Sequence, residues 1–212
     1  MKYQGVIFDL DGVICHTDQY HFKAWKMLAD RLGIYFDEKI NHRLRGVSRM
    51  ESLEIILENY DGQCTQEEKL AYAQEKNSSY QKLLQQMTPD DLCPGVMETL
   101  ETLRGLGIRL AIGSSSKNAQ MILEKLGLDG FFDTVTDGNH ITRSKPDGEV
   151  FAKAAAGLGL APESCLVVED AKAGLLAAKD AGMDSAGIAD AAASPLAAYR
   201  LEQIGDLLRI VA

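Results

Sequence analysis

Two carboxylates spaced two residues apart, Asp9 and Asp11, follow the apolar run 5–8 and precede Gly12. Alternate residues of a strand point the same way, and Gly12 permits a turn, so both acids are expected at the strand's carboxyl end. Protonation, a cationic side chain or a hard divalent ion such as Mg²⁺ can relieve the repulsion between them. With an ion bound, one carboxylate can attack phosphorus while the other exchanges a proton with a hydroxyl. A solvated turn is the alternative for an isolated Asp-x-Asp-Gly.

A second acidic pair, Glu169 and Asp170, ends the apolar run 166–168. If its strand neighbours the first one, the side chains of Asp9, Asp11, Glu169 and Asp170 form an oxygen-rich pocket suited to Mg²⁺. The alternative is that the pair lies at a helix N-terminus, where the dipole favours acids.

Candidate anion-binding groups follow the apolar run 110–113, where Ser114, Ser115, Ser116, Lys117 and Asn118 precede an amphipathic segment. Hydroxyls, free amides and a lysine at a helix start can bind an anion. A serine N-cap with an exposed lysine is the alternative.

A lysine in a third loop, Lys145, precedes another helical segment, and Pro146 suits the first turn of that helix. Lys145 would then neutralise a phosphoryl oxygen and the acid cluster. The alternative for a single lysine is a solvated surface side chain.

The elements that position these loops follow from hydrophobic periodicity. Residues 18–87 repeat apolar residues at three and four, which predicts helices and no strand. The first strand candidate is 5–8. Beyond residue 93, further strand candidates (109–112, 132–135, 165–168 and 185–188) alternate with helix candidates (96–106, 119–126, 150–158 and 173–181). We therefore predict an α/β fold: a Rossmann-like parallel sheet core of residues 1–15 and 93–212, with an inserted α-helical cap domain of residues 16–92. Sites in such sheets lie outside the carboxyl ends of the strands. The alanine-rich stretch 189–198 predicts a turn leading into a surface helix.

Bulk composition restricts the class of protein. With 212 residues and 46% hydrophobic content, the chain can bury a core, and its net charge of -9 argues against binding to nucleic acid or to an anionic membrane. A phosphate site must therefore be locally basic. Four scattered cysteines favour reduced thiols, and the short apolar run before Asp9 indicates neither a signal peptide nor a membrane span, so we expect a cytoplasmic protein. With no partner motif visible, we expect a monomer.

These segments together resemble the four motifs of the haloacid dehalogenase superfamily of phosphotransferases: 9–13, Ser114, Lys145 with Pro146, and Glu169 with Asp170. The resemblance spans the whole chain, including a helical cap after the first motif. It implies that Asp9 becomes phosphorylated, that Asp11 is the general acid and base, and that Ser114 and Lys145 bind the transferring phosphoryl group. It also implies one Mg²⁺ per chain, held by Asp9, the backbone carbonyl of Asp11, and Asp170 with Glu169 nearby.

The cap segment 45–52 contains Ser48 and Glu51 in the pattern of a capping box, so a helix is expected to begin there. Its amides, with Arg45, Gly46 and Arg49, can clasp an anion or sugar hydroxyls, while the alternative is a capped helix with two surface arginines. The segment closely resembles the cap loop of the β-phosphoglucomutase family, as does segment 17–25. From spacing alone, His21 and Trp25 are packing residues on one helix face.

This second resemblance implies further roles. His21 would contact Asp11, with Thr17 also catalytic, and Ser116, Lys117, Asn118 and Arg49 would bind a spectator phosphate. The sugar pocket would be lined by Trp25, Arg45, Gly46, Val47, Ser52, Lys76 and Ser115. The implied reaction interconverts β-D-glucose 1-phosphate and D-glucose 6-phosphate through an aspartyl phosphate and β-D-glucose 1,6-bisphosphate, with cap closure excluding water.

Three departures from the family pattern bear on specificity: Cys15-His16 in place of Thr-Asp, Arg45 in place of lysine, and Ser115 in place of alanine. None removes a primary role. A sugar-phosphate phosphatase, with water as the acceptor, and a non-catalytic sugar-phosphate sensor are the alternative functions.

Overall fold

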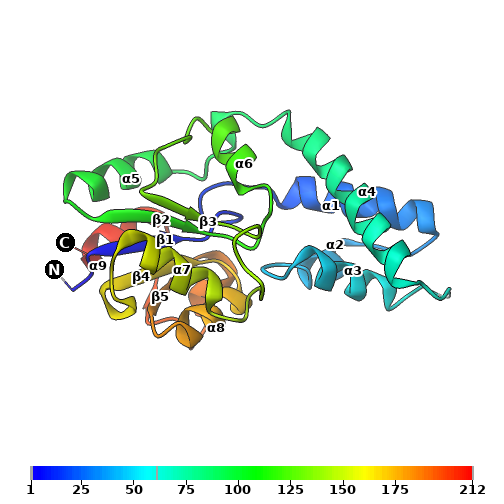
Figure 1. Ribbon diagram of the computed structural model, residues 1–212. Helices are drawn as coiled ribbons and strands as arrows, with labels where there is room; N and C mark the ends of the chain where they lie inside the picture. The colour runs from blue at the N-terminus through cyan, green and yellow to red at the C-terminus, as the bar shows by residue number, and fades with distance from the viewer. Residues whose placement is uncertain (1, 61, 212) are drawn as a thin grey trace.

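The computed structural model describes residues 2–60 and 62–211, which form a helix-covered sheet and a separate group of helices beside it (Figure 1). The sheet has six parallel strands in the order β3-β2-β1-β4-β5-β6. Their bounds are β1 Gly5–Phe8, β2 Arg109–Gly113, β3 Thr134–Thr136, β4 Cys165–Glu169, β5 Asp184–Gly187 and β6 Tyr199–Arg200. This is the predicted α/β fold with a parallel sheet.

The register of the central strands aligns their carboxyl ends. Phe8 of β1 pairs with Ile112 of β2 on one side and with Val168 of β4 on the other. Asp9, the loop after Gly113 and the pair Glu169-Asp170 therefore meet at one edge of the sheet. The order reverses on the two sides of β1, which is where open α/β sheets bind ligands.

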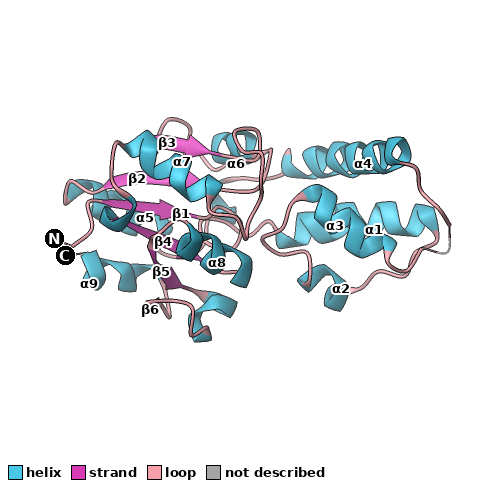
Figure 2. Ribbon diagram, turned by 60° about the horizontal axis from the view of Figure 1, so that its bottom comes forward, coloured by secondary structure: helices cyan, strands magenta, loops and turns pink. Residues whose placement is uncertain are grey.

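Helices cover both faces of the sheet because its strands alternate their side chains (Figure 2). Val6 and Phe8 point into a core with one set of helices: α5 Val96–Gly105, α6 Ala119–Lys125 and α9 Leu208–Val211. Ile7 and Val167 point the other way, into a core with α7 Glu149–Leu158 and α8 Lys172–Asp180.

The second group comprises four helices: α1 Asp18–Leu32, α2 Glu38–His42, α3 Arg49–Leu57 and α4 Gln66–Leu84. It has its own apolar core, in which Trp25, Leu28, Leu53 and Ile56 are buried. Ser48 and Glu51 form the predicted capping box at the start of α3, and Gly33 ends α1 in the left-handed conformation. Short 3₁₀ turns complete the chain at Pro89–Asp91, Pro162–Ser164, Ala189–Ala193 and Ile204–Leu207.

The prediction of a surface helix after residue 189 is wrong. Residues Ala189–Ala193 form a 3₁₀ turn, and the chain then adds β6 to the edge of β5. The amides of Ala198 and Leu201 donate to the carbonyls of Ser185 and Gly187. Unpaired backbone groups at the edge of β5 therefore outweigh the helix propensity of the alanines.

The predicted place of Pro146 in a first helical turn is also wrong. Helix α7 begins at Glu149 with Gly148 as its N-cap, and the Lys145–Pro146 bond is cis. Residues 144–147 instead form a turn, closed by a hydrogen bond from the amide of Asp147 to the carbonyl of Ser144. This turn directs Lys145 inward.

Cys15, Cys64, Cys93 and Cys165 are free thiols, the first and last of them buried. Within residues 2–60 and 62–211, no helix combines the length and the apolar character that a membrane span needs.

Candidate active site

The centre of the site is a buried network of one lysine and two carboxylates. The Nζ atom of Lys145 lies 2.5 Å from Oδ1 of Asp9 and 2.5 Å from Oε1 of Glu169, and its side chain is 1% exposed. Burial lowers the pKa of Lys145, but the charges of Asp9 and Glu169 outweigh this and hold the pKa above its ordinary value. The lysine therefore stays charged beside Asp9, where it can neutralise an oxygen of a phosphoryl group.

Three buried carboxylates could hold a cation. Asp9, Glu169 and Asp170 each place an oxygen within 4.8 Å of the others. Burial, together with the mutual repulsion of these acids, raises the pKa of Glu169 to about 7 and that of Asp170 to about 8. An all-oxygen donor set with excess negative charge fits a hard ion such as Mg²⁺. The side chain of Asp11 lies outside this cluster.

Two glycines permit the close packing of these acids. Gly12 has φ 89°, and a Cβ there would overlap the carboxylate of Asp170. A Cβ at Gly174 of α8 would overlap the carboxylate of Glu169. The cluster therefore depends on the absence of side chains at both positions.

Asp11 lies where the first loop leads into α1. Its carboxylate accepts a hydrogen bond from the hydroxyl of Thr17, the N-cap residue of that helix. Burial and the charge of Asp9 raise the pKa of Asp11 to about 6, against the opposing effect of Thr17. A carboxyl group in this range can both donate and accept a proton near neutral pH.

The loop after β2 presents a chain of hydroxyls. Ser114 is 1% exposed, and its Oγ accepts a hydrogen bond from the amide of Ser116, whose own Oγ accepts one from the amide of Asn118. The buried Oγ of Ser115 has no hydrogen-bond partner among the described residues. Lys117 is exposed to solvent.

The amide of Asn118 is engaged by helix α4. Its Oδ1 accepts from Gln81 at 2.9 Å, and its Nδ2 donates to Oδ1 of Asn77 at 3.0 Å. The side chain predicted to bind phosphate is therefore joined in this structure to the helical group.

Helices α1 and α4 place a second buried lysine across the cleft. Lys76 is 3% exposed, with Nζ 2.9 Å from Nδ1 of His21 and 4.4 Å and 4.8 Å from the ring centres of Tyr80 and Trp25. Burial holds the pKa of Lys76 and of His21 well below their ordinary values. No carboxylate forms an ion pair with Lys76 in the described part of the chain, and its hydrogen-bond partner is Nδ1 of His21.

His21 and Asp11, which were expected to be in contact, have separate hydrogen-bond partners. No hydrogen bond joins these two side chains in residues 2–60 and 62–211, since Asp11 accepts from Thr17 and His21 meets Lys76. His21 nevertheless lines the same cleft as Asp11.

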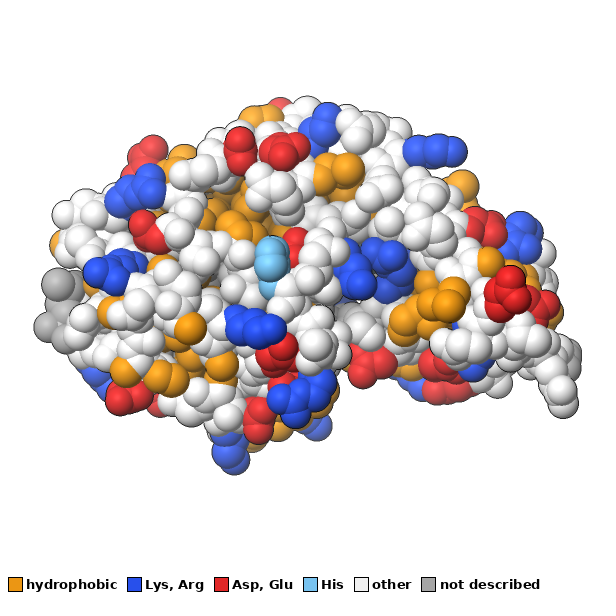
Figure 3. Space-filling model, in the orientation of Figure 1, with side chains coloured by type: hydrophobic (Ala, Val, Ile, Leu, Met, Phe, Trp, Pro, Cys, Tyr) orange, Lys and Arg blue, Asp and Glu red, His pale blue; other side chains and the backbone are white. Residues whose placement is uncertain are grey.

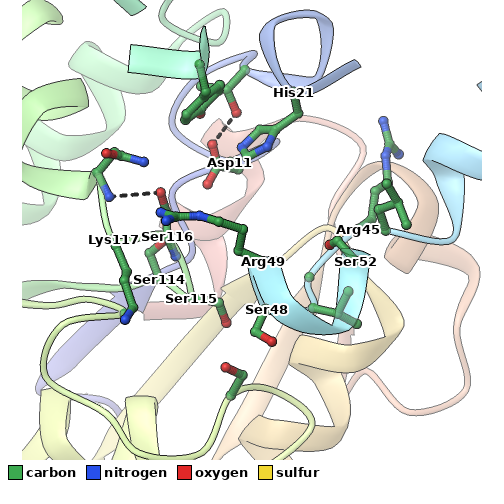
Figure 4. A pocket seen from close by; sticks show the side chains of 18 of the residues that line it. Asp11, His21, Arg45, Ser48, Arg49, Ser52, Ser114, Ser115, Ser116 and Lys117 are labelled. Atoms are coloured by element: carbon green, nitrogen blue, oxygen red, sulfur yellow. Dashed lines mark hydrogen bonds between the residues drawn. The ribbon is translucent and has the colours of Figure 1, made fainter. Parts of the chain in front are cut away.

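One cleft of about 560 Å³ collects nearly all the predicted residues. Figure 3 shows Lys and Arg side chains gathered at the hollow between the sheet and the helical group. Figure 4 shows the side chain of Arg49 reaching from the start of α3 toward Ser116. The predicted residues that line the cleft are Asp9, Asp11, Thr17, His21, Trp25, Arg45, Gly46, Val47, Arg49, Ser52, Lys76, Ser114, Ser115, Ser116, Lys117, Asn118, Lys145 and Asp170. Glu169 lies behind this lining, against Lys145.

Sequence reasoning missed Tyr80, whose ring lies 4.1 Å from that of His21 and below the Lys76 ammonium. Its spacing of four residues from Lys76 on α4 was the available signal. Asp18 and Asn41 also line the cleft, and nothing in their spacing distinguishes them from surface residues.

Comparisons with known proteins extend over the sheet and the helical group. A model of the haloacid dehalogenase-like hydrolases matches residues 3–182. The β-phosphoglucomutase of Bacillus subtilis (strain 168) is 43% identical over 187 residues, covering 87% of this chain and 83% of that protein. A phosphorylated carbohydrates phosphatase of Thermotoga maritima is 32% identical over 184 residues, covering 85% of this chain and 82% of that protein. A crystal structure of β-phosphoglucomutase from Clostridium difficile matches with a TM-score of 0.91 and 38% identity, covering 97% of this chain and 93% of that chain.

Proposed function

Because this chain belongs to the haloacid dehalogenase-like hydrolase family, we propose that it is a β-phosphoglucomutase. It interconverts β-D-glucose 1-phosphate and D-glucose 6-phosphate through an aspartyl phosphate and β-D-glucose 1,6-bisphosphate. The sequence identity of 43% to a protein of that name supports the reaction type. The helical insert of residues 16–92 acts as a cap over the sheet domain.

The observation that carries this proposal is that two sets of cationic and hydroxyl side chains line one cleft. Lys145 contacts Asp9 and Ser114 follows the neighbouring strand β2, whereas Arg49, Ser116 and Lys117 complete the lining of the same cleft of about 560 Å³. A sugar bisphosphate needs one set for the transferring group and another for the spectator phosphate. A phosphatase acting on a monophosphate requires only the first.

Asp9 is the nucleophile in this proposal. One of its oxygens bonds to phosphorus as the bond from phosphorus to the sugar oxygen breaks, and Asp11 donates the proton that the leaving hydroxyl needs. In the second half, Asp11 accepts the proton of the other sugar hydroxyl as that oxygen takes the phosphoryl group from Asp9. Lys145 and Ser114 hold the phosphoryl oxygens in both halves.

One Mg²⁺ would be held by the carboxylates of Asp9 and Asp170, with Glu169 beside them, and by the backbone carbonyl of Asp11. When bound, it would neutralise charge on the transferring phosphoryl group.

The remaining cleft residues bind the sugar and the spectator phosphate. Arg49 with Ser116, Lys117 and Asn118 takes the phosphate, and the hydroxyl of Thr17 orients Asp11, with His21 in the same cleft. The sugar contacts a set drawn from both domains: Trp25, Arg45, Gly46, Val47, Ser52, Lys76 and Ser115. Cap closure removes water from the reacting groups.

Anomer-resolved phosphorus NMR tests the proposal. Purified protein with Mg²⁺ and trace β-D-glucose 1,6-bisphosphate should convert β-D-glucose 1-phosphate, and not the α anomer, to glucose 6-phosphate. The Asp9→Asn variant should fold but lose turnover, and retained activity would contradict the covalent mechanism.

A sugar-phosphate phosphatase is the second candidate, favoured by the relative named as a phosphorylated carbohydrates phosphatase at 32% identity. In that case water takes the place of the second sugar hydroxyl. Release of inorganic phosphate faster than formation of glucose 6-phosphate in the same NMR experiment would establish this function instead.

A further inference from the structure

The charged contacts between the cap and the sheet domain converge on one residue. Among the described residues, Asp190 pairs with Nη1 of Arg45 at 2.6 Å, and Nδ1 of His42 lies 3.8 Å from the same carboxylate, a contact that is an ion pair only when the imidazole is protonated. The other ion pairs of the cap connect cap residues to one another, as Arg43 does with Glu58.

Asp190 stands at the same sheet edge as the site. It follows β5 in the 3₁₀ turn Ala189–Ala193, beyond the carboxyl end of the strand. Ala189 before it has φ 51°, the only positive φ among the described non-glycine residues.

Two guanidinium nitrogens of Arg45 are held by carboxylates. Its Nη2 donates to Asp18 at the start of α1, at 3.2 Å, while Nη1 donates to Asp190. A planar guanidinium can bridge two carboxylates in this way, whereas an ammonium cannot match that geometry. In Figure 4, Arg45 lies apart from the loop of Ser114 to Lys117, toward which Arg49 reaches.

The residue after Arg45 packs directly on the sheet domain. Gly46 has φ 74°, and a Cβ built there would lie 3.3 Å from the Cβ atoms of both Ala171 and Ala173. These alanines follow Asp170, so the start of the cap loop touches the chain beside the carboxylate cluster. The ion pair at Arg45 therefore lies in the segment that leads into α3, the helix that carries Arg49 and Ser52.

We propose that Asp190 is a positioning residue, which through Arg45 holds the cap loop against the sheet domain and keeps water from phosphorylated Asp9. The inference rests on the function proposed above. In the reaction it suppresses, a water oxygen bonds to phosphorus, the bond from phosphorus to the Asp9 carboxylate breaks, and water gives up a proton. Inorganic phosphate leaves in place of a sugar phosphate.

The single tryptophan provides a test of closure that needs no activity. Trp25 is 2% exposed and lines the cleft, so opening of the cap should increase quenching of its fluorescence by acrylamide. Salt screens exposed charges, so quenching of the wild type should rise between 50 and 500 mM NaCl. Asp190→Asn should show the raised value already at low salt, with little further dependence on salt.

Controls separate the charge from general effects on folding. Asp190→Glu should restore most of the protection and its salt dependence. Glu58→Gln removes an ion pair of similar exposure within the cap and should behave as the wild type. Unchanged quenching in Asp190→Asn would overturn the proposal, whatever the activity.

Partition of the phosphoenzyme supplies the second measurement. The ratio of inorganic phosphate to glucose 6-phosphate should rise about 2- to 5-fold in Asp190→Asn, as expected for loss of an exposed ion pair, and stay constant in Glu58→Gln. A changed quenching with an unchanged ratio would overturn the role in water exclusion. A wild type that makes no glucose 6-phosphate would refute the proposed function, while the quenching result would still decide the ion pair's role.

Discussion

Replacing Gly174 with alanine tests how rigidly Glu169 is held. Glycine in a helix interior is worth about 0.5–1 kcal/mol less than alanine, so this change in α8 would ordinarily stabilise the protein. Here the new Cβ would overlap the carboxylate of Glu169. The glutamate must move, because the helix backbone that carries the Cβ is packed against the sheet.

The cost follows from the contacts that Glu169 would lose. Its Oε1 accepts from Nζ of Lys145 at 2.5 Å, and its Oε2 accepts from the amide of Ala171 at 2.9 Å. Each hydrogen bond to a charged group contributes about 1.5–3 kcal/mol. We therefore expect Gly174→Ala to destabilise the protein by about 2–5 kcal/mol, although alanine in place of glycine ordinarily stabilises a helix.

Urea unfolding followed by circular dichroism, in the presence of EDTA, measures this change. Calorimetric titration with Mg²⁺ should show affinity about 10- to 100-fold lower, as for the loss of supporting contacts around a metal site. Gly105→Ala is the matched control, because Gly105 ends α5 with open space around its Cβ position. If Gly174→Ala is as stable as this control and binds Mg²⁺ normally, Glu169 is free to move and the reasoning fails.

Three further predictions concern the charges and turns around the site. Lys145→Met leaves Asp9 and Glu169 buried without their cation, so the free energy of unfolding in EDTA should fall by about 3–5 kcal/mol and partly recover with Mg²⁺. An equal loss with and without Mg²⁺ would contradict the role of Lys145 in neutralising the two carboxylates. Gly12→Ala, at φ 89° and against Asp170, should abolish calorimetric Mg²⁺ binding, and an unchanged isotherm would disprove the steric argument. Hydrogen bonds from Lys153 and the amide of Arg143 lower the pKa of Glu149 from 4.5 to about 2, so this carboxylate stabilises the fold above pH 4.5 and loses that effect as pH falls toward 2. Glu149→Gln should thus be less stable than the wild type in urea at pH 6 and equal near pH 2, whereas a gap that persists in acid would rule out this linkage.

Much of the architecture was predictable because it depends on local periodicity. Buried parallel strands are continuous apolar runs, so β1 and β4 were recognisable, and the capping box of Ser48 and Glu51 marked the start of α3. The loop residues at strand ends followed from the rule that parallel strands share one carboxyl edge. The edge strand β6 was not predictable, because two residues pair there only through the unpaired backbone of β5.

Residue types and spacing by themselves determined which groups could do chemistry: the acids at 9 and 11, the hydroxyls from 114, the lysine at 145 and the acids at 169 and 170. The tertiary structure alone decided how those groups are partnered. It places Lys145 between Asp9 and Glu169, sets Lys76 against His21, and turns Arg45 toward Asp190, 145 residues away in sequence. Such pairings depend on which surfaces meet when the helical group packs against the sheet, and no local pattern encodes a contact between side chains so distant along the chain.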